Sequence, residues 1–278
     1  MASKYVVKQA QTKEELYAIM DVIWAANYTP YEPIVQIVFP VLGYQPADRE
    51  ASVVESKERF WKNHENDPSS NWFYVQEIAS GHVVGSAQWQ IFKDNPFPKD
   101  TAPLTAPWWP EGEHREYCES ILNQIYKPRV SWMKRPHLAL NWMAVHPSHR
   151  RCGVATMLME VGVSHADFLN VEAWMESSEM GKPLYENHGF RPLFKIDFDT
   201  HKKDPGDIWR KCEYEMRVKP LFPMWRPKQG DWEEKGGRPG IQMPWELGEQ
   251  GNSRTLGMEK APEISVASLP PAGALAAV

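Results

Sequence analysis

The feature that most constrains the fold of this chain is a strand, turn and helix pattern over residues 138–156. The apolar run Leu138–Val145 stops before a proline, and a basic turn containing Gly153 then opens a long amphipathic segment. The first amides of a helix have no partner inside the helix, and its N-terminal end favours anions. The pattern therefore predicts a site for a phosphate-bearing ligand, flanked by Arg150 and Arg151.

The turn contains the residue types that a backbone cradle for phosphate needs. Glycine allows a ligand to approach the main chain closely, and a small Ala155 lets the helix pack tightly against the strand. Successive amides can then form an anion-binding nest, which we expect from Arg151, Gly153, Val154, Ala155 and Thr156. The turn has neither the Lys-Ser/Thr pair of a P-loop nor the three glycines of a dinucleotide fingerprint. The alternative is an ordinary turn with its arginines in solvent.

Composition restricts the class of protein. The chain has 278 residues, 42% hydrophobic and 24% charged, with a formal net charge of −5. These values favour a globular protein with one sizeable domain, and its scattered basic residues are atypical of nucleic-acid binding. Its three cysteines are widely spaced, which indicates reduced thiols. We find no signal peptide pattern and no apolar run of roughly 18 residues, so we expect a cytoplasmic protein that makes no membrane contact. A nuclear pool is left open.

Hydrophobic periodicity along the chain predicts an α/β protein with a mixed sheet. The segment 34–42 fits either a short helix or an extended loop. The expected strands cover residues 5–9, 72–77, 83–92, 137–145, 171–175, 194–198 and 213–219. The expected helices begin at Thr12 (with Glu15 completing a capping box) and cover 48–66, 153–169 and 181–188, with a further helical segment over 111–132 broken at Pro128.

Tryptophan and proline are frequent, with 13 and 24 copies, and several of each fall in two stretches. We interpret residues 92–136 as an insertion in a domain that covers residues 1–219. Residues 220–278 then form an irregular, Trp/Pro/Gly-rich C-terminal extension, whose end is expected to be disordered.

A second motif lies about 30 residues after the basic turn. It reads Leu184-Tyr185-Glu-Asn-His-Gly189-Phe190. Together with the strand ending in Ala144-Val145 and the Arg150-x-x-Gly-x-Ala turn, it resembles the GNAT acyltransferase superfamily over roughly residues 4–219. The resemblance implies a mostly antiparallel mixed sheet with splayed central strands flanked by helices, and acetyl-CoA as co-substrate.

The same resemblance implies where acetyl-CoA binds. The pantetheine arm would lie between the strands at 138–145 and 171–175, and a bulge in the first strand would turn an amide, that of Met143 or its neighbour, toward the thioester carbonyl. The residues implied to contact the cofactor are Met143, Ala144, Val145, Arg150, Arg151, Cys152, Gly153, Val154, Ala155, Thr156, Ser178 and Tyr185.

The resemblance also implies catalytic residues. Tyr185 falls at the position of a general acid that protonates the leaving thiolate, although a packing tyrosine is the alternative. Residues 139–142 provide neither a carboxylate nor an imidazole as a base. Asn141 is expected to orient a water or the acceptor. Glu32 is a candidate base or amine-binding carboxylate, and Glu176 is a second candidate.

Other chemistries are less well supported by the sequence. His146, His149 and Cys152 lie close together, but a zinc site needs a more complete ligand set, so we expect no metal. Cys152 in the turn is poorly placed as a nucleophile, which favours direct transfer to the acceptor. Trp108, Trp109 and Trp132 either line an acceptor pocket or fasten the insertion to the domain.

Three functions remain open at this point. The first is N-acetylation of a small-molecule amine such as a metabolite, xenobiotic or antibiotic. The second is acetylation of protein lysines or N-termini. The third is a non-catalytic acetyl-CoA-binding module that recruits partners through the C-terminal extension. The sequence predicts no nucleic-acid partner and leaves the oligomeric state open, with a homodimer as one alternative.

Overall fold

The computed structural model describes residues 3–232, which form a seven-stranded sheet with helices on both faces. The strand order is β1-β2-β3-β4-β5-β7-β6. Within the described residues, β4 and β5 are the one parallel pair, and the other neighbours are antiparallel. The predicted mixed, mostly antiparallel sheet is confirmed. The strands are β1 (Tyr5–Gln9), β2 (Ser70–Glu77), β3 (Val83–Phe92), β4 (His137–Val145), β5 (Glu172–Ser178), β6 (Arg191–Pro192) and β7 (Leu221–Arg226).

The helices begin where capping and apolar periodicity predict them in the N-terminal half. Helix α1 has the expected capping box between Thr12 and Glu15. The ambiguous segment after Tyr31 forms a short helix that starts with proline at its first position, as helices favour. The helices are α1 (Lys13–Asn27), α2 (Pro33–Val38), α3 (Pro46–Asn66), α4 (Glu113–Trp132), α5 (Val154–Phe168), α6 (Lys182–Glu186) and α7 (Asp207–Glu215).

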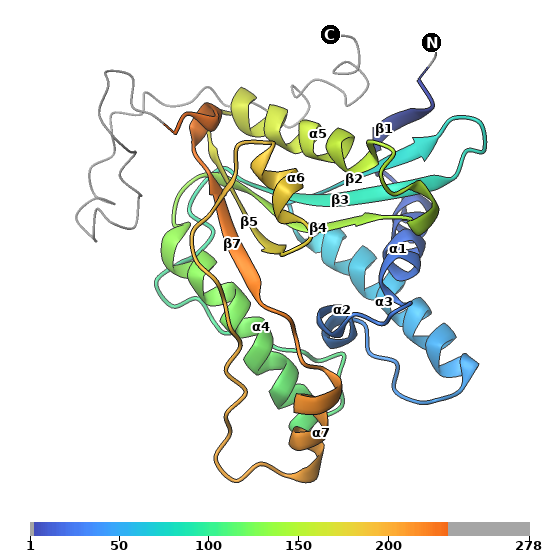
Figure 1. Cartoon of the computed structure of the whole chain (residues 1–278), viewed down its shortest axis with the longest axis vertical. Coiled ribbons are helices and arrows are strands. Elements are labelled where there is room, and N and C mark those ends of the chain that lie inside the picture. Colours follow the sequence, from blue (N-terminus) through green and yellow to red (C-terminus); the bar gives the residue numbers. More distant parts are fainter. Residues whose placement is uncertain (1–2, 233–278) are drawn as a thin grey trace.

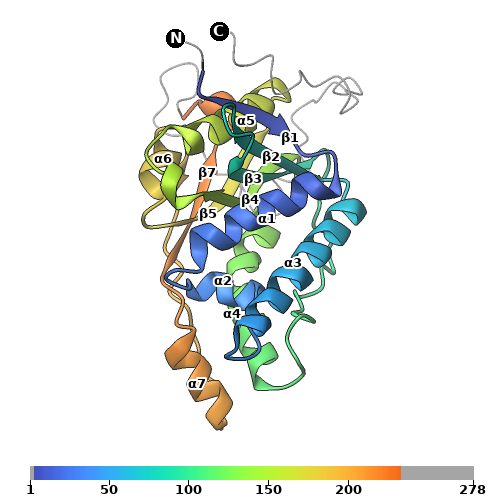
Figure 2. The ribbon, with the colours of Figure 1, turned by 90° about the vertical axis from the view of Figure 1, so that its right-hand side faces the viewer.

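Alternating side chains of β2 show how the layers are arranged. Trp72 and Tyr74 pack with the buried residues of α1 and Phe60 of α3. Phe73 and Val75 point to the other face, where they join the core formed with α5. Helices α1 and α3 therefore cover one face of the sheet and α5 covers the other (Figures 1 and 2).

Close packing fixes α5 against the sheet. A Cβ atom at Gly162 would lie 1.9 Å from a ring carbon of Trp89. The Trp89 indole also donates a hydrogen bond to the carbonyl of Leu158, at 3.3 Å. Glycine at this position therefore lets the helix lie directly on the ring, and the start of α5 is held beside the end of β4.

The first half of α4, in the insertion, and the segment before β7 pack on one another away from the sheet (Figure 1). Tyr117 of α4 contacts Trp209 of α7 edge to face, with 5.2 Å between ring centroids. The carboxylate of Glu113 accepts hydrogen bonds from the backbone amides of Gly206 and Trp209, at 2.9 and 3.1 Å. Glu113 thus caps the first turn of α7 and joins the two segments.

Three expectations for the C-terminal half are wrong. Residues 213–219 are not a strand, since α7 occupies 207–215, and residues 194–198 contribute only an isolated bridge through Ile196. The strand that completes the sheet is β7, in the stretch assigned to the extension. Its internal Pro223 argues against a strand on local grounds. Pairing with β5 overrides that preference, and the Pro223 carbonyl accepts a hydrogen bond from the Leu193 amide.

Helix α4 also differs from expectation, because it continues through Pro128. Proline removes one intrahelical hydrogen bond, but Ile121 and Arg129 on either side of it are buried and hold the helix in place. Among residues 3–232, no helix has the length and apolar character needed to cross a bilayer.

Candidate functional site

The central strands separate halfway along their length. Backbone pairing between β4 and β5 runs from His137 and Glu172 to Leu140 and Met175, and then stops. Beyond that point, β4 pairs only with β3. The edge of residues 141–145 that faces β5 therefore has no strand partner in the described part of the chain, and its main-chain groups are available to a ligand.

A bulge marks the point of separation. Trp142 pairs with Gln88 and Leu140 pairs with Trp89, so Asn141 is an extra residue on β4. Bulges bend a strand and re-aim its groups, and they are frequent next to active sites. The bulge implied by the resemblance is therefore present, and its side chain is exposed in the opening.

The basic turn forms an open cradle at the start of α5. Gly153 adopts a left-handed conformation with φ 81°, and an added Cβ would meet nothing within 4 Å. Within residues 3–232, the backbone amides of residues 151–156 donate no hydrogen bond, and the helix has no side-chain cap. Arg150 donates to the carbonyl of Ala26 at 2.9 Å, which ties the turn to the end of α1. These amides fit a pyrophosphate.

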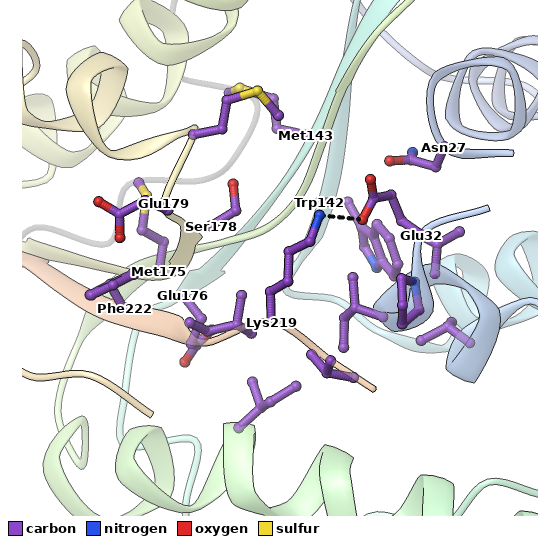
Figure 3. A pocket seen from close by; sticks show the side chains of 18 of the residues that line it. Asn27, Glu32, Trp142, Met143, Met175, Glu176, Ser178, Glu179, Lys219 and Phe222 are labelled. Atoms are coloured by element: carbon purple, nitrogen blue, oxygen red, sulfur yellow. Dashed lines mark ion pairs between the residues drawn. The ribbon is translucent and has the colours of Figure 1, made fainter. Parts of the chain in front are cut away.

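A cavity of about 1150 Å³ continues from the strand opening to α2 and α4 (Figure 3). This volume is slightly above the usual range for small-molecule sites, which is about 300–1,000 Å³. Apolar side chains from the two helices face one another across it, and charged groups lie on its walls. The lining includes Glu32, Ile34, Val35, Val38, Leu104, Leu122, Ile125, Tyr126, Arg129, Asn141, Trp142, Met143, Arg150, Met175, Glu176, Ser178, Glu179, Tyr185, Lys195, Val218, Lys219 and Phe222.

Tyr185 reaches the cavity from α6. Its ring fits against Gly181, where an added Cβ would lie 2.8 Å from a ring carbon. Burial raises the pKa of Tyr185 to about 12, because the charged phenolate is disfavoured away from water. Among the described residues, no hydrogen-bond partner contributes to this shift of the pKa of Tyr185. The phenol therefore stays protonated at neutral pH and is available as a donor.

Glu32 and Lys219 face each other across the mouth of the cavity (Figure 3). The Lys219 Nζ lies 3.7 Å from Oε2 of Glu32, and the two side chains are 82% and 35% exposed. Such exposed ion pairs are weak. Glu32 precedes α2 but makes no capping hydrogen bond with its side chain, so its carboxylate is free to exchange Lys219 for another cation.

Glu176 is engaged by neighbouring donors. Its Oε1 accepts from the Trp174 indole at 2.6 Å and from Arg129 Nε at 3.3 Å. Its Oε2 accepts from Arg129 Nη2. Because both oxygens are occupied in a buried ion pair, this geometry argues against Glu176 as a free base.

The residues expected at the site fall into two groups. Glu32, Asn141, Met143, Arg150, Ser178 and Tyr185 line the cavity. Residues 151–156 lie beyond it, at the start of α5. The side chain of Ala144 is buried in the core below α1, so only its main chain can face a ligand. Val145 continues β4 toward the turn.

The histidines and Cys152 of the turn take part in local contacts. The Tyr5 hydroxyl lies 3.0 Å from Nδ1 of His149. His146 accepts a hydrogen bond from the amide of Ser148. The thiol of Cys152 is exposed and lies 3.4 Å from the carbonyl of Arg150.

The tryptophans of the insertion fasten it to the domain. The indoles of Trp108 and Trp109 both donate to the carbonyl of Ile37 in α2, each at 2.8 Å. Trp132 packs edge to face on Trp174 and Phe194. None of these three tryptophans is among the described residues that line the cavity, which favours the fastening role over the pocket role.

Sequence reasoning missed four charged residues that line the cavity, which are Arg129, Glu179, Lys195 and Lys219. Arg129 lies in the apolar stripe of α4, at helical spacing from Cys118, Leu122 and Ile125. A charge on an apolar helix face is a signal for a buried partner. Lys219 has no comparable signal, because its position follows from the pairing of β7 with β5.

Comparisons with known proteins agree with this geometry. A family model described as "Acetyltransferase (GNAT) domain" matches residues 119–192. The structure of mosquito arylalkylamine N-acetyltransferase like 5b is 13% identical with a TM-score of 0.50, and the match covers 80% of this chain and 99% of that one. The apo structure of an agmatine N-acetyltransferase mutant is 14% identical, with a TM-score of 0.50. The match covers 80% of this chain and 99% of that one.

A third solved structure comes from Corynebacterium glutamicum and is described as histone acetyltransferase HPA2 and related acetyltransferase. It is 21% identical, with a TM-score of 0.49, and covers 81% of this chain and 97% of that one. No curated protein matches the chain.

The fold has two central strands that separate beside a helix N-terminus. Residues 119–192 match the GNAT acetyltransferase domain model, and the fold of the described residues is similar to those of the solved N-acetyltransferases.

Proposed function

We propose that this protein is an acetyl-CoA-dependent N-acetyltransferase that acts on the amine of a small molecule. The observation that carries the proposal is the continuity of the site. Free amides at the start of α5 lead along the unpaired edge of β4 into a cavity with Glu32 at its far side. A thioester and an amine bound at these two ends would meet beside Asn141 and Tyr185.

Each end of the site supports one part of the reaction. The turn at 150–156 would hold the pyrophosphate, and the edge of β4 at Met143–Val145 would pair with the amides of the pantetheine arm. Acetyl-CoA supplies an acyl group activated as a thioester. Holding the two reactants together accounts for much of the rate in a direct transfer.

The chemistry that follows is a nucleophilic addition and elimination. The amine nitrogen forms a bond to the acetyl carbon, and a main-chain amide next to the bulge stabilises the negative charge on the carbonyl oxygen. The carbon–sulfur bond then breaks. The Tyr185 phenol donates a hydrogen bond to the developing thiolate. Overall, the nitrogen loses one proton and the sulfur gains one, so that CoA leaves as the free thiol.

The acceptor side favours a small amine with an apolar body. Ile34 and Val38 of α2 face Leu122 and Ile125 of α4 across the cavity, and this surface can cover an aliphatic or aromatic group. Glu32 is proposed to bind the ammonium group and to receive its proton, directly or through water. An unperturbed amine has a pKa of about 10, so it is mostly protonated at neutral pH. Its proton must be removed before the nitrogen can attack, because an ammonium group has no lone pair.

An assay of thiol release tests the proposal. The purified protein is incubated with acetyl-CoA and with matched panels of hydrophobic amines, polar amines and lysine-containing peptides. Turnover with hydrophobic amines and not with peptides is the expected result. Peptide turnover alone would favour the protein acetyltransferase alternative, and tight CoA binding without turnover would favour a non-catalytic module.

A further inference from the structure

One side chain connects the two strands just beyond the point where they stop pairing. Arg129, in the last turn of α4, donates from Nε and Nη2 to the carboxylate of Glu176 on β5. Its Nη1 lies 3.4 Å from Oδ1 of Asn141 on β4. The guanidinium is only 5% exposed. A group from the insertion therefore bridges the base of the strand opening.

The two partners of Arg129 occupy equivalent places on the separating strands. Glu176 is the first residue of β5 after the last paired residue, and Asn141 is the bulged residue at the same level of β4. The planar guanidinium fork can hold a carboxylate with two nitrogens and leave a third for another acceptor. The guanidinium of Arg129 lies where the next pair of residues of β4 and β5 would otherwise form backbone hydrogen bonds.

The nitrogen of the Asn141 side-chain amide is hydrogen-bonded to a residue of β3. Its Nδ2 donates to Oε1 of Gln88 at 3.1 Å, and Nε2 of Gln88 donates to Oγ of Ser70 at 2.8 Å. Gln88 and Ser70 are both buried. Because Arg129 takes the oxygen and Gln88 takes the nitrogen, the side chain of the bulge has one orientation.

We infer that Arg129 is a positioning residue for acetyl transfer. It fixes Asn141 against Glu176, and so sets both the width of the opening and the direction of the amides of Trp142 and Met143 that follow the bulge. Arg129 also neutralises Glu176, which would otherwise place an unpaired negative charge near the developing oxyanion. The inference rests on the proposed function, and Arg129 itself is not assigned a contact with the reacting atoms.

Replacement of Arg129 tests this role. Arg129→Met is expected to lower kcat about 100-fold, because small displacements of a reacting group have effects of that size. The affinity for CoA should stay within about threefold, since the amides at the start of α5 are untouched. Arg129→Lys keeps the charge but cannot reach both partners in the same way, so an intermediate loss in kcat is expected.

The chain offers a matched control at the paired end of the same strand. Arg135 also forms an ion pair with a buried glutamate of β5, Glu172, at a rung where β4 and β5 still pair. Arg135→Met should lower stability and leave kcat unchanged. Equal kcat losses in Arg129→Met and Arg135→Met, or wild-type kcat in Arg129→Met, would overturn the inference.

A second readout separates this inference from the proposed function. If the wild-type protein acetylates no amine or peptide, the proposed function fails. The inference is then judged from the ¹⁵N-amide NMR shifts of Trp142 and Met143 with acetyl-CoA and with CoA. A shift difference present in the wild type and Arg135→Met but lost in Arg129→Met supports it, and the same difference in all three overturns it. Should Arg129→Met not fold, Arg129→Lys serves in both comparisons.

Discussion

Leu140 of β4 and Met175 of β5 are the last residues at which the two central strands pair. Asn141 directly after Leu140 is a bulge, and Glu176 directly after Met175 is bound by Arg129. The separation of the strands is therefore built into the residues that follow this pair. It creates an unpaired strand edge next to the cavity.

The glycine of the basic turn provides a test of cofactor binding. Gly153→Asp would place a negative charge where the amides at the start of α5 are proposed to bind pyrophosphate, so calorimetry should detect no affinity for CoA. Gly112→Asp is a matched control, because Gly112 also precedes a helix with positive φ and open space around its Cβ. The control should bind CoA normally. Normal binding by Gly153→Asp would contradict the proposed cradle.

Tyr185→Phe tests the proposed donor to the thiolate. The loss of one hydroxyl should lower kcat about 100-fold, with little change in the affinity for CoA. Because the pKa of Tyr185 is raised to about 12, its ionisation should not reduce kcat of the wild type up to about pH 10. Tyr117→Phe, a change at a buried tyrosine of the insertion, is the control. Unchanged turnover in Tyr185→Phe would remove the hydroxyl from the mechanism.

Glu32 and Lys219 are expected to affect the acceptor in opposite directions. Glu32→Gln should raise the KM for the amine about tenfold, since a charge-assisted hydrogen bond is lost. Lys219→Met releases the carboxylate from an exposed ion pair and should lower this KM by about two- to fivefold. Glu179→Gln changes a carboxylate on the opposite wall and serves as the control. Wild-type KM values in both Glu32→Gln and Lys219→Met would show that the carboxylate does not bind the amine.

His137 is expected to make stability depend on pH. It is fully buried and its Nδ1 donates to the carbonyl of Arg135 at 2.7 Å. Burial lowers its pKa to about 3, whereas an unfolded histidine binds a proton near pH 6.5. The unfolded state therefore gains a proton first as the pH falls.

The free energy of unfolding should consequently decrease below about pH 6.5, by about 1.4 kcal/mol per pH unit for this one group. Urea unfolding at several pH values between 7 and 4 measures the slope. His137→Asn keeps a hydrogen-bond donor but does not titrate. The slope of the unfolding free energy against pH should therefore decrease by the contribution of one proton, about 1.4 kcal/mol per pH unit. His64 and His165, whose pKa values are also lowered by burial, would account for part of the remainder. An identical slope in the variant would show that His137 titrates normally in the folded protein.

Local sequence signals predicted the parts of the molecule that depend on neighbouring residues. The capping box at Thr12, the hairpin around Gly81, and the turn before α5 all depend on contacts within a few residues. The two GNAT-like motifs indicated where the central strands lie. These elements position the cofactor side of the proposed site.

The proposed acceptor side depends on contacts between distant segments, which local patterns do not show. β7 joins the sheet through pairing with β5 although it contains Pro223. This pairing brings Lys219 opposite Glu32. Arg129 reaches Glu176 because α4 packs across β5 and β7, with its Trp132 against Trp174. A single sequence shows neither juxtaposition.

The shared carbonyl of Ile37 has a mechanical consequence for the loop that carries Glu32. Helix α2 has only six residues, too few to be stable in isolation, and two indoles from the insertion hold its last turn. The carboxylate of Glu32, which is proposed to bind the amine, is therefore tied to the insertion through α2. Truncating either tryptophan would loosen Glu32 from a distance, without altering any residue that lines the cavity.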